Sequence, residues 1–296
     1  MKILVLGQNG QVGGALSSLL MPLGEVIAAD RQSIDLSNLN DLRDSIRAIA
    51  PDLIVNAAAY TAVDQAESEP ELAMTVNGLA PGAITAEAAT LGAAVIHYST
   101  DYVFDGTSDR PYVEADETYP INEYGKSKLA GEQAIQASDA AHIILRTSWV
   151  YGALGKNFLL TVMRLAKERH ELRIVSDQLG CPTSAISIAK ATRNLIAEFA
   201  ESENIAAAMA PYAGLYHFSS AGVASWYEFA CAIVEGMDWS GDRAQPTVTP
   251  IPTEAYPTPA KRPKYSVLSK SKFCETFALT VPDWRESLAE VMSHVA

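Results

Sequence analysis

Two side chains with complementary proton chemistry, Tyr124 and Lys128, are four residues apart in the segment NEYGKSKLAGE, residues 122–132. Asn122 is a good helix N-cap, so the segment predicts a helix on which these side chains share one face, with Cβ atoms about 5–6 Å apart. Bringing a tyrosine from its usual pKa of about 10 to about 7 requires roughly 4 kcal/mol of selective support for the phenolate. A nearby ammonium supplies such support. The pair therefore predicts a proton-transfer acid, Tyr124, and a tuning cation, Lys128.

Hydroxyl groups follow an apolar run shortly upstream, in the sequence His97-Tyr-Ser-Thr-Asp101. If this run is a strand of a parallel sheet, its carboxyl end lies at the edge where such sheets bind ligands. Ser99 or Thr100 is then placed to donate a hydrogen bond to the same oxygen that Tyr124 serves. A Tyr-x-x-x-Lys spacing alone is common on exposed helices, so the prediction rests on this combination.

A glycine-rich turn follows the first apolar run, with Gly7, Gly10 and Gly13 in a G-x-x-G-x-x-G spacing. Glycines allow a tight turn and a close backbone approach, and the free amides of a helix that begins near Gln11 can hold a diphosphate. The spacing departs from the G-x-G-x-x-G form of the general dinucleotide fingerprint. We nevertheless expect a nucleotide site here.

Two neighbouring residues, which follow the second apolar run at 25–29, favour different nucleotides. Asp30 lies near the distance at which an acid reaches an adenosine ribose, which favours NADH, whereas Arg31 favours a 2′-phosphate and hence NADPH. A strand-end aspartate that caps a turn explains Asp30 equally well. Small residues at 57–59 would let a flat cofactor lie against the backbone, or simply allow tight packing of a helix on the sheet.

The elements that must position these residues alternate between short apolar runs and longer helical patterns. The expected strands are Lys2–Leu6, Glu25–Ala29, Asp52–Asn56, Ala94–Ser99 and His142–Arg146. Continuous apolar strands are typical of a parallel sheet covered on both faces by helices. We therefore predict an α/β fold, a doubly wound Rossmann-type sheet, over residues 1–150. Residues 151–296, richer in proline, predict a smaller mixed α/β substrate domain that includes a strand near Leu215–Phe218. One segment of this half is a candidate to return to the sheet.

The composition excludes several classes of protein. Of the 296 residues, 48% are hydrophobic and 19% are charged, as in an ordinary globular protein. The formal net charge of -13 argues against nucleic-acid binding, since no strong basic patch offsets it. Cys181, Cys231 and Cys274 have neither zinc-site spacing nor an even count. No membrane span or secretory leader is recognisable, so we expect a cytoplasmic protein.

Longer strings make a narrower match that covers essentially the whole chain. They are NAAAYTAVDQAESE at 56–69, YSTDYVFDG at 98–106, LRTSWVY at 145–151, DQLGCPT at 177–183 and YPTPAKRP at 256–263. With the glycine turn and the Tyr124–Lys128 pair, the chain resembles the dTDP-4-dehydrorhamnose reductase family of the extended short-chain dehydrogenase/reductase superfamily. This resemblance implies that NADPH or NADH gives hydride to C4 of a dTDP-linked 4-keto-6-deoxy sugar, dTDP-4-dehydro-L-rhamnose, in the synthesis of dTDP-L-rhamnose, a precursor of cell-surface polysaccharide.

The resemblance also implies roles for individual residues. Tyr124 would be the proton donor, Lys128 would bind the nicotinamide ribose, and Thr100 would hydrogen-bond the reacting oxygen. The positions that match the family's cofactor contacts are Gly10, Gln11, Val12, Asp30, Asp35, Leu36, Ala59, Tyr60, Thr61 and Tyr98, beside Gly7 and Arg31 from the turn and the strand end. Thr100, Asp101 and Trp149 match its sugar-nucleotide contacts.

Two further residues are predicted from their chemistry. Trp149 follows the fifth expected strand, where an aromatic wall can order a sugar or a base, although packing between domains also explains it. Arg262, in the most basic stretch of the chain, can neutralise a substrate diphosphate through bidentate hydrogen bonds. A solvated linker is the alternative for that stretch.

The resemblance departs from the family pattern at a metal site. Some members are dimers bridged by magnesium through glutamates, where this chain has Ala15 and Ile186. We therefore predict no bound metal, and a monomer or weak homodimer. Two alternative functions remain open: a nucleotide-sugar 4-epimerase, which uses the same motifs, and a non-catalytic subunit that binds NADP. The presence of both Tyr124 and Lys128 argues against the second.

Overall fold

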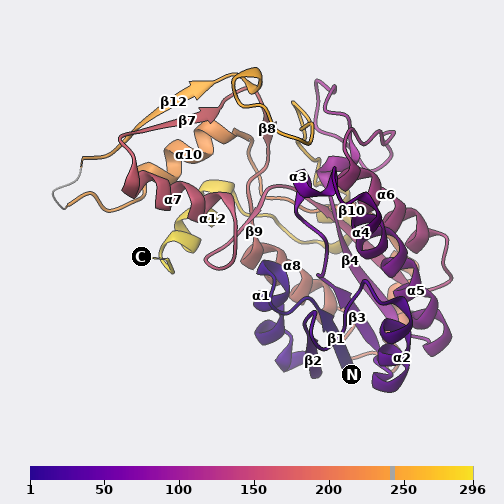
Figure 1. The fold of residues 1–296 in the computed structure, drawn as a ribbon. Coiled ribbons are helices and arrows are strands. Elements are labelled where there is room, and N and C mark those ends of the chain that lie inside the picture. The colour runs from indigo at the N-terminus through magenta and orange to yellow at the C-terminus, as the bar shows by residue number, and fades with distance from the viewer. Residues whose placement is uncertain (241–243, 296) are drawn as a thin grey trace.

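A six-stranded parallel sheet forms the centre of the computed structural model, which describes residues 1–240 and 244–295 (Figure 1). Its strand order is β10-β5-β4-β3-β1-β2, and every neighbouring pair is parallel. The strands are β1 (Lys2–Leu6), β2 (Glu25–Ala29), β3 (Leu53–Asn56), β4 (Ala94–Thr100), β5 (His142–Thr147) and β10 (Gly214–His217). The predicted α/β fold class is confirmed.

Helices cover both faces of this sheet because successive strand residues point to opposite sides. On β1, Ile3 and Val5 pack toward α1 (Gln11–Leu19) and α8 (Ala185–Ala197). Leu4 and Leu6 pack toward the other face. The helices there are α2 (Leu39–Ile49), α5 (Ala80–Leu91) and α6 (Glu123–Gln136). The sheet and these five helices are called the sheet lobe below.

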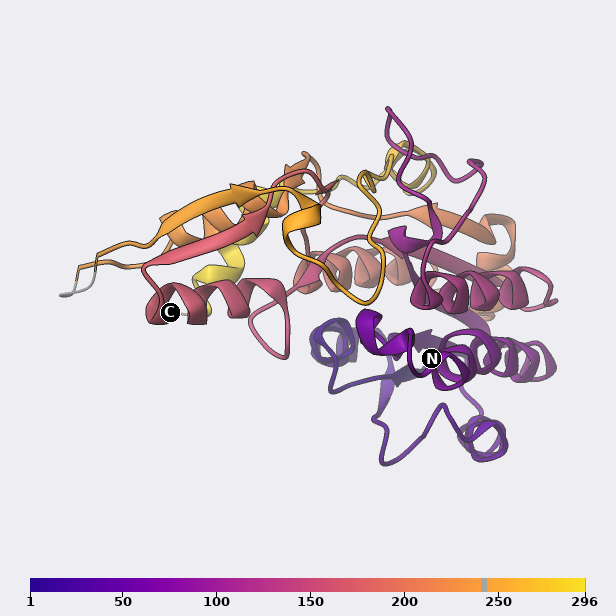
Figure 2. The same cartoon turned by 45° about the horizontal axis from the view of Figure 1, so that its top comes forward.

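A second body, the small lobe, lies beside the carboxyl ends of the strands in both ribbon views (Figures 1 and 2). Its core contains Tyr151, Phe229 and Trp284, all nearly or fully buried. It is built from α7 (Phe158–Glu168), β7 (Glu171–Val175), α10 (Trp226–Glu235), β12 (Thr247–Ile251) and α12 (Trp284–Met292). Strands β7 and β12 pair in parallel, and Ser225 and Glu228 form a capping box that begins α10.

The second half of the chain also contributes to the sheet lobe. Strand β10 extends the sheet at the edge of β5, and α8 packs against α1. Short paired strands link the lobes: β6 (Val150–Tyr151) with β9 (Thr183–Ser184), and β8 (Leu179–Gly180) with β11 (Ala224–Ser225). The remaining helices are α3 (Val63–Ala66), α4 (Pro70–Met74), α9 (Ile205–Met209), α11 (Ser271–Phe277) and a π-helical turn at Thr75–Leu79. The 3-10 turns are Met21–Leu23, Asp101–Val103, Ala210–Tyr212 and Thr253–Ala255.

Candidate active site

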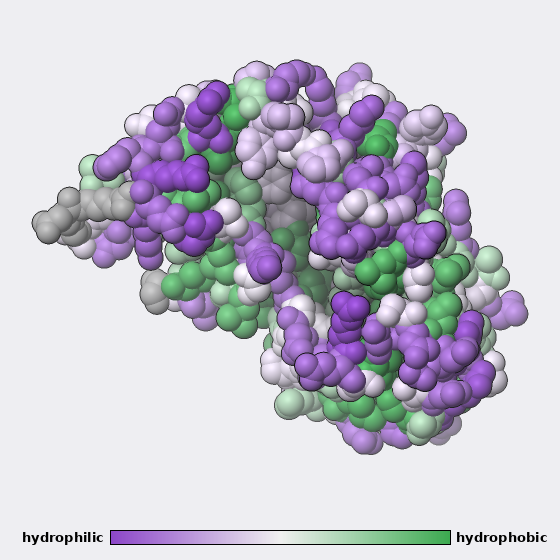
Figure 3. Space-filling view, in the orientation of Figure 1, coloured by the Kyte–Doolittle hydropathy of each residue, from purple (hydrophilic) through white to green (hydrophobic). Residues whose placement is uncertain are grey.

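A cavity of about 620 Å³ opens at the carboxyl ends of the strands, and Figure 3 shows the surface hollowed between the two lobes. This is the edge where open parallel sheets bind ligands, and the volume is typical of a ligand site. Of the predicted site residues, its lining includes Gly7, Gly10, Gln11, Val12, Ala59, Thr61, Tyr98, Thr100, Asp101, Tyr124, Lys128 and Trp149. Asn9, Ser99, Thr147, Lys156 and Trp226 also line it.

The glycine turn forms one end of the cavity. Gly7 has φ +90°, and a Cβ there would lie 2.8 Å from the amide nitrogen of Ala58. A Cβ on Gly13 would lie 2.1 Å from the Gly7 carbonyl oxygen. Helix α1 begins at Gln11 without a side-chain cap, so its first amides are free to bind an anion. The turn therefore fits a diphosphate.

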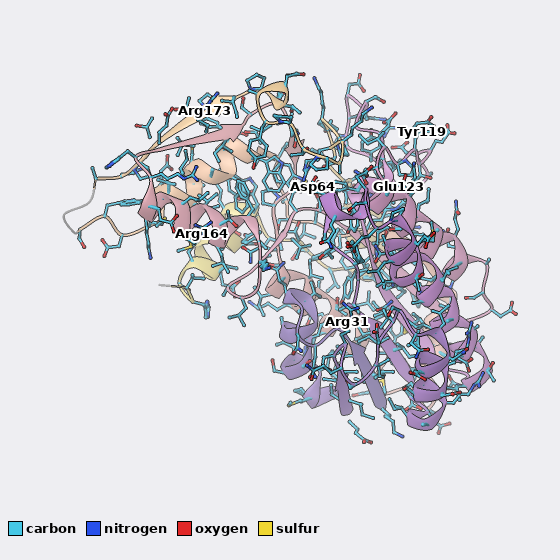
Figure 4. All side chains as sticks on the ribbon, viewed as in Figure 1. Arg31, Asp64, Tyr119, Glu123, Arg164 and Arg173 are labelled. Atoms are coloured by element: carbon cyan, nitrogen blue, oxygen red, sulfur yellow. The ribbon has the colours of Figure 1, made fainter. Side chains whose placement is uncertain are left out.

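A smaller pocket of about 120 Å³ continues from the turn and is lined by Asp30, Arg31, Asp35, Leu36 and Tyr60. The Asp30 carboxylate accepts hydrogen bonds from the amide and the hydroxyl of Ser33 and from the amide of Gln32, all at 3.0 Å, and these bonds hold its pKa below the ordinary value. Arg31 reaches the Asp35 carboxylate at 3.7 Å and is well exposed (Figure 4). Asp30 thus caps a turn and also faces the pocket. Its role as a turn cap therefore does not exclude a contact with an adenosine ribose.

Tyr124 lies in the first turn of α6, whose N-cap is Asn122, as the sequence predicts. Its ring lies nearly perpendicular to that of Tyr102, with centroids 5.6 Å apart and planes at 78°. Burial raises the pKa of Tyr124 to about 12, while the Thr100 hydroxyl beside it acts to lower the pKa and the Asp101 charge to raise it. Burial therefore outweighs the groups of the chain that favour the phenolate, and the shift toward 7 in the cofactor-loaded site stays a prediction.

Lys128 is almost completely buried, one helical turn after Tyr124. Its Nζ donates to the Tyr98 carbonyl oxygen at 2.6 Å and lies 3.2 Å from Nε2 of His97. Burial lowers the pKa of Lys128 to about 8, and Glu132 partly opposes this shift. The lysine is therefore held between α6 and β4 with its charge only weakly favoured near neutral pH.

Asp101 is buried beneath Thr100 at the end of β4. Ser148 donates to Oδ2 of Asp101 at 2.8 Å, and the Thr100 hydroxyl donates to Oδ1 at 3.1 Å. Burial raises the pKa of Asp101 to about 6, although hydroxyls from Ser266, Ser148 and Thr100 act in the other direction. The Thr100 hydroxyl has one hydrogen to donate. It can therefore donate to a ligand oxygen only when its hydrogen bond to Asp101 is broken.

Two buried hydroxyls, on residues that line the cavity, have no hydrogen-bond partner within the described structure. They are Ser99 Oγ and Thr147 Oγ1, both buried. Buried polar atoms are normally paired, so these two hydroxyls leave hydrogen bonds unmade beside the cavity. The glycine turn and the polar residues of the lining fit a dinucleotide such as NADPH or NADH.

Trp149 forms one wall of the cavity and stacks on Trp226, a residue that the sequence analysis missed. Trp226 begins α10 in the small lobe, and its indole Nε1 donates to Gln178 Oε1 at 3.2 Å. No spacing in the sequence relates the two tryptophans, which are brought together only by the packing of the lobes. His97, another residue missed, is recognisable only through its contact with Lys128.

Arg262 lies outside the lining of both pockets, although it was predicted to meet a substrate diphosphate. Its two Nη atoms bind the Asp64 carboxylate at 3.0 and 2.8 Å. Asp64 belongs to α3 and is labelled in Figure 4, and it also accepts a hydrogen bond from the amide of Ala260, so it fastens the segment around Arg262 to that helix. The segment is therefore not a freely solvated linker, and the diphosphate contact stays a prediction.

Potential metal ligands are not clustered within residues 1–240 and 244–295: no group of three or more His, Cys, Asp or Glu side chains there is arranged to hold a metal ion. Ala15 and Ile186 lie on α1 and α8, and Cys181, Cys231 and Cys274 are free thiols. No helix between residues 1 and 240 or 244 and 295 has the length and apolarity needed to cross a membrane.

Comparison with known proteins gives one consistent family. The model of the RmlD substrate binding domain matches residues 1–296. The chain is 46% identical to a dTDP-4-dehydrorhamnose reductase of Escherichia coli K12, over 100% of this chain and 98% of that protein. It is 48% identical to one from Burkholderia thailandensis, over 96% of each.

Solved structures agree. A dTDP-4-dehydrorhamnose reductase from Clostridium acetobutylicum superposes with a TM-score of 0.90 at 38% identity, over 100% of this chain and 99% of that one. One from Bacillus anthracis, in complex with NADP, gives 0.88 at 34% identity, over 99% of both chains. The chain belongs to the RmlD substrate binding domain family, the family of these dTDP-4-dehydrorhamnose reductases.

Proposed function

We propose that this chain is an NAD(P)H-dependent dTDP-4-dehydrorhamnose reductase, which reduces the C4 keto group of dTDP-4-dehydro-L-rhamnose to give dTDP-L-rhamnose. The observation that carries the proposal is that Tyr124, Lys128 and Thr100 line the same cavity as the glycine turn. An acid, a cation and a hydroxyl donor beside a dinucleotide-sized turn are what reduction of a carbonyl requires.

Tyr124 is the proton donor in this proposal. NAD(P)H, when bound, would supply the hydride to C4, and the electron pair of the C4 carbonyl would move onto its oxygen. Tyr124 Oη gives its proton to that oxygen, so the Tyr124 O–H bond breaks as the new O–H bond forms. With a pKa near 12, Tyr124 is protonated at neutral pH, and an alkoxide is a much stronger base than a phenolate. The charge of Lys128 offsets the phenolate that remains.

The other lining residues bind and orient. The free amides at the start of α1 hold the cofactor diphosphate, Lys128 holds the nicotinamide ribose, and Asp30 and Arg31 face the adenosine end. Thr100 donates to the reacting oxygen, while Asp101 and Trp149 contact the sugar nucleotide. Residues 1–150 therefore serve mainly the cofactor and residues 151–296 mainly the sugar nucleotide, while β10 extends the sheet and α8 packs against α1.

Incubation of the purified chain with the dTDP-4-keto-6-deoxy-L-sugar and each reduced cofactor tests the proposal. We expect absorbance of the reduced nicotinamide to fall in proportion to a dTDP-linked product that carries two additional hydrogens. Interconversion of sugars without net cofactor consumption would instead identify an epimerase. Tight NADP binding with no turnover would identify a non-catalytic subunit.

A further inference from the structure

Three buried polar side chains form a line from the centre of the sheet to the proposed active site. Asn56 ends β3, His97 is its register partner on β4, and Lys128 lies on α6. Each is at most 2% exposed. Asn56 Nδ2 lies 3.1 Å from His97 Nδ1, and His97 Nε2 lies 3.2 Å from Lys128 Nζ. The proposed mechanism uses the lysine and gives no role to the other two.

The orientation of Asn56 fixes the tautomer of His97. The amide of Ala58 donates to Asn56 Oδ1 at 3.2 Å, so the Asn56 Nδ2 group is the one that faces the ring. An amide NH₂ only donates, so His97 Nδ1 must accept. A neutral imidazole carries one proton, which therefore lies on Nε2, the nitrogen that faces Lys128.

The ring stays neutral because of its surroundings. Full burial and the charge of Lys128 both lower the pKa of His97 well below its ordinary value. Burial also lowers the pKa of Lys128, and the charge of Glu132, on the same helix, opposes this shift. An N–H aimed at Nζ is accepted only by the lone pair of an uncharged amine. If Lys128 is an ammonium, its N–H groups and the His97 Nε2–H are all donors, and no hydrogen bond forms between them.

We propose that His97 is a positioning residue for Lys128: its Nε2–H, aimed by Asn56, holds Nζ between β4 and α6 and favours the uncharged amine over the ammonium. The second contact, from Nζ to the Tyr98 carbonyl oxygen at 2.6 Å, fixes the direction of the lysine in either form. Lys128, the cation beside Tyr124, therefore loses its proton at a lower pH than it would through burial alone. This inference rests on the proposed function only in the kinetic test, where turnover is used to detect the charge state of Lys128.

The pH profile of the His97→Gln variant tests the inference. Glutamine has similar reach and can turn its carbonyl oxygen toward Nζ, which stabilises the ammonium. The pH at which kcat falls on the basic side should therefore move up by about one unit. The matched control is His142→Gln, on β5, because His142 is also buried but faces the Ala140 carbonyl oxygen at 2.9 Å and does not line the cavity. Its profile should match the wild type.

Nitrogen NMR of the unmodified protein gives a readout that needs neither turnover nor a variant. The His97 ring, assigned through its bonds to the His97 backbone, should show a neutral Nε2–H tautomer from about pH 5 to about pH 9. A neutral Nδ1–H tautomer, or a charged ring, overturns the inference. So does a basic limb that does not move in His97→Gln while the wild type turns over. Absence of wild-type turnover would count against the proposed function alone, since the tautomer is measured independently.

Discussion

The ring of Trp149 lies flat against the ring of Trp226, with centroids 3.5 Å apart and planes 4° from parallel. Trp149 has φ +48°, which is rare for a bulky side chain. A Cβ at residue 180, a glycine, would lie 2.5 Å from the Trp149 ring. Contacts between the lobes, rather than backbone preference, therefore hold the indole at the wall of the cavity.

Loss of this stack should weaken both folding and substrate binding. We expect Trp226→Ala to lower the free energy of unfolding by about 2 kcal/mol, because a half-buried aromatic ring is removed. KM for the sugar nucleotide should rise, and KM for the cofactor should change little. Denaturant unfolding and steady-state kinetics check this. Trp239→Ala, also in the small lobe but outside the cavity lining, is the control, with KM values close to wild type. An unchanged KM in Trp226→Ala would contradict a substrate role for the stack.

Removal of one hydroxyl should separate catalysis from binding. Tyr124→Phe lacks the transferred proton, so kcat should fall by about 10³-fold while cofactor affinity stays near normal. Rapid kinetics and cofactor titration measure the two effects. Tyr102→Phe is a stringent control because its ring contacts Tyr124 and also lines the cavity. If Tyr102→Phe loses turnover and Tyr124→Phe keeps it, the acid has been assigned to the wrong tyrosine.

The buried carboxyl of Asp101 should make folding pH-dependent. Its pKa is about 6 in the folded chain and 3.8 in an unperturbed one. As the pH rises through this window, the unfolded chain releases the proton first, so the contribution of Asp101 to stability is full below 3.8 and is lost through about 6.

Asp101→Asn cannot ionise and should lack this loss. Relative to the wild type, the variant should gain up to roughly 3 kcal/mol of unfolding free energy between about pH 4 and about pH 7. Urea unfolding at several pH values measures the difference, from which the contributions of other carboxylates largely cancel. Parallel stability curves for the two proteins would show that Asp101 is not perturbed by burial.

Cofactor preference should respond to the charge of Asp30. Asp30→Asn keeps an oxygen for the amides of Gln32 and Ser33 but removes the charge that would repel a 2′-phosphate. The ratio of kcat/KM for NADPH to that for NADH should rise about tenfold, about 1.4 kcal/mol. Arg31→Ala should move the ratio in the opposite direction. An unaltered ratio in Asp30→Asn would place the carboxylate away from the ribose.

The central sheet was predictable because each strand is a continuous apolar run, and Lys2–Leu6 and Glu25–Ala29 match their predicted bounds. The position of β10 beside β5 was not predictable, since a short strand pattern does not show which strand it pairs with. Tyr124 and Lys128 were found because helix geometry relates residues four apart. The contacts of Trp226, His97 and Arg262 depend on pairs separated by 31 to 198 positions, and no local spacing encodes them.

Transfer of hydride to C4 can be followed with a deuterium atom. The chain is incubated with dTDP-4-dehydro-L-rhamnose and NADPH or NADH deuterated on the transferred position, and the product is examined by NMR. We expect deuterium at C4 of a dTDP-linked 6-deoxy sugar, with one cofactor oxidised for each product formed. A product without deuterium at C4, or conversion without net oxidation of the cofactor, would show that the chain is not this reductase.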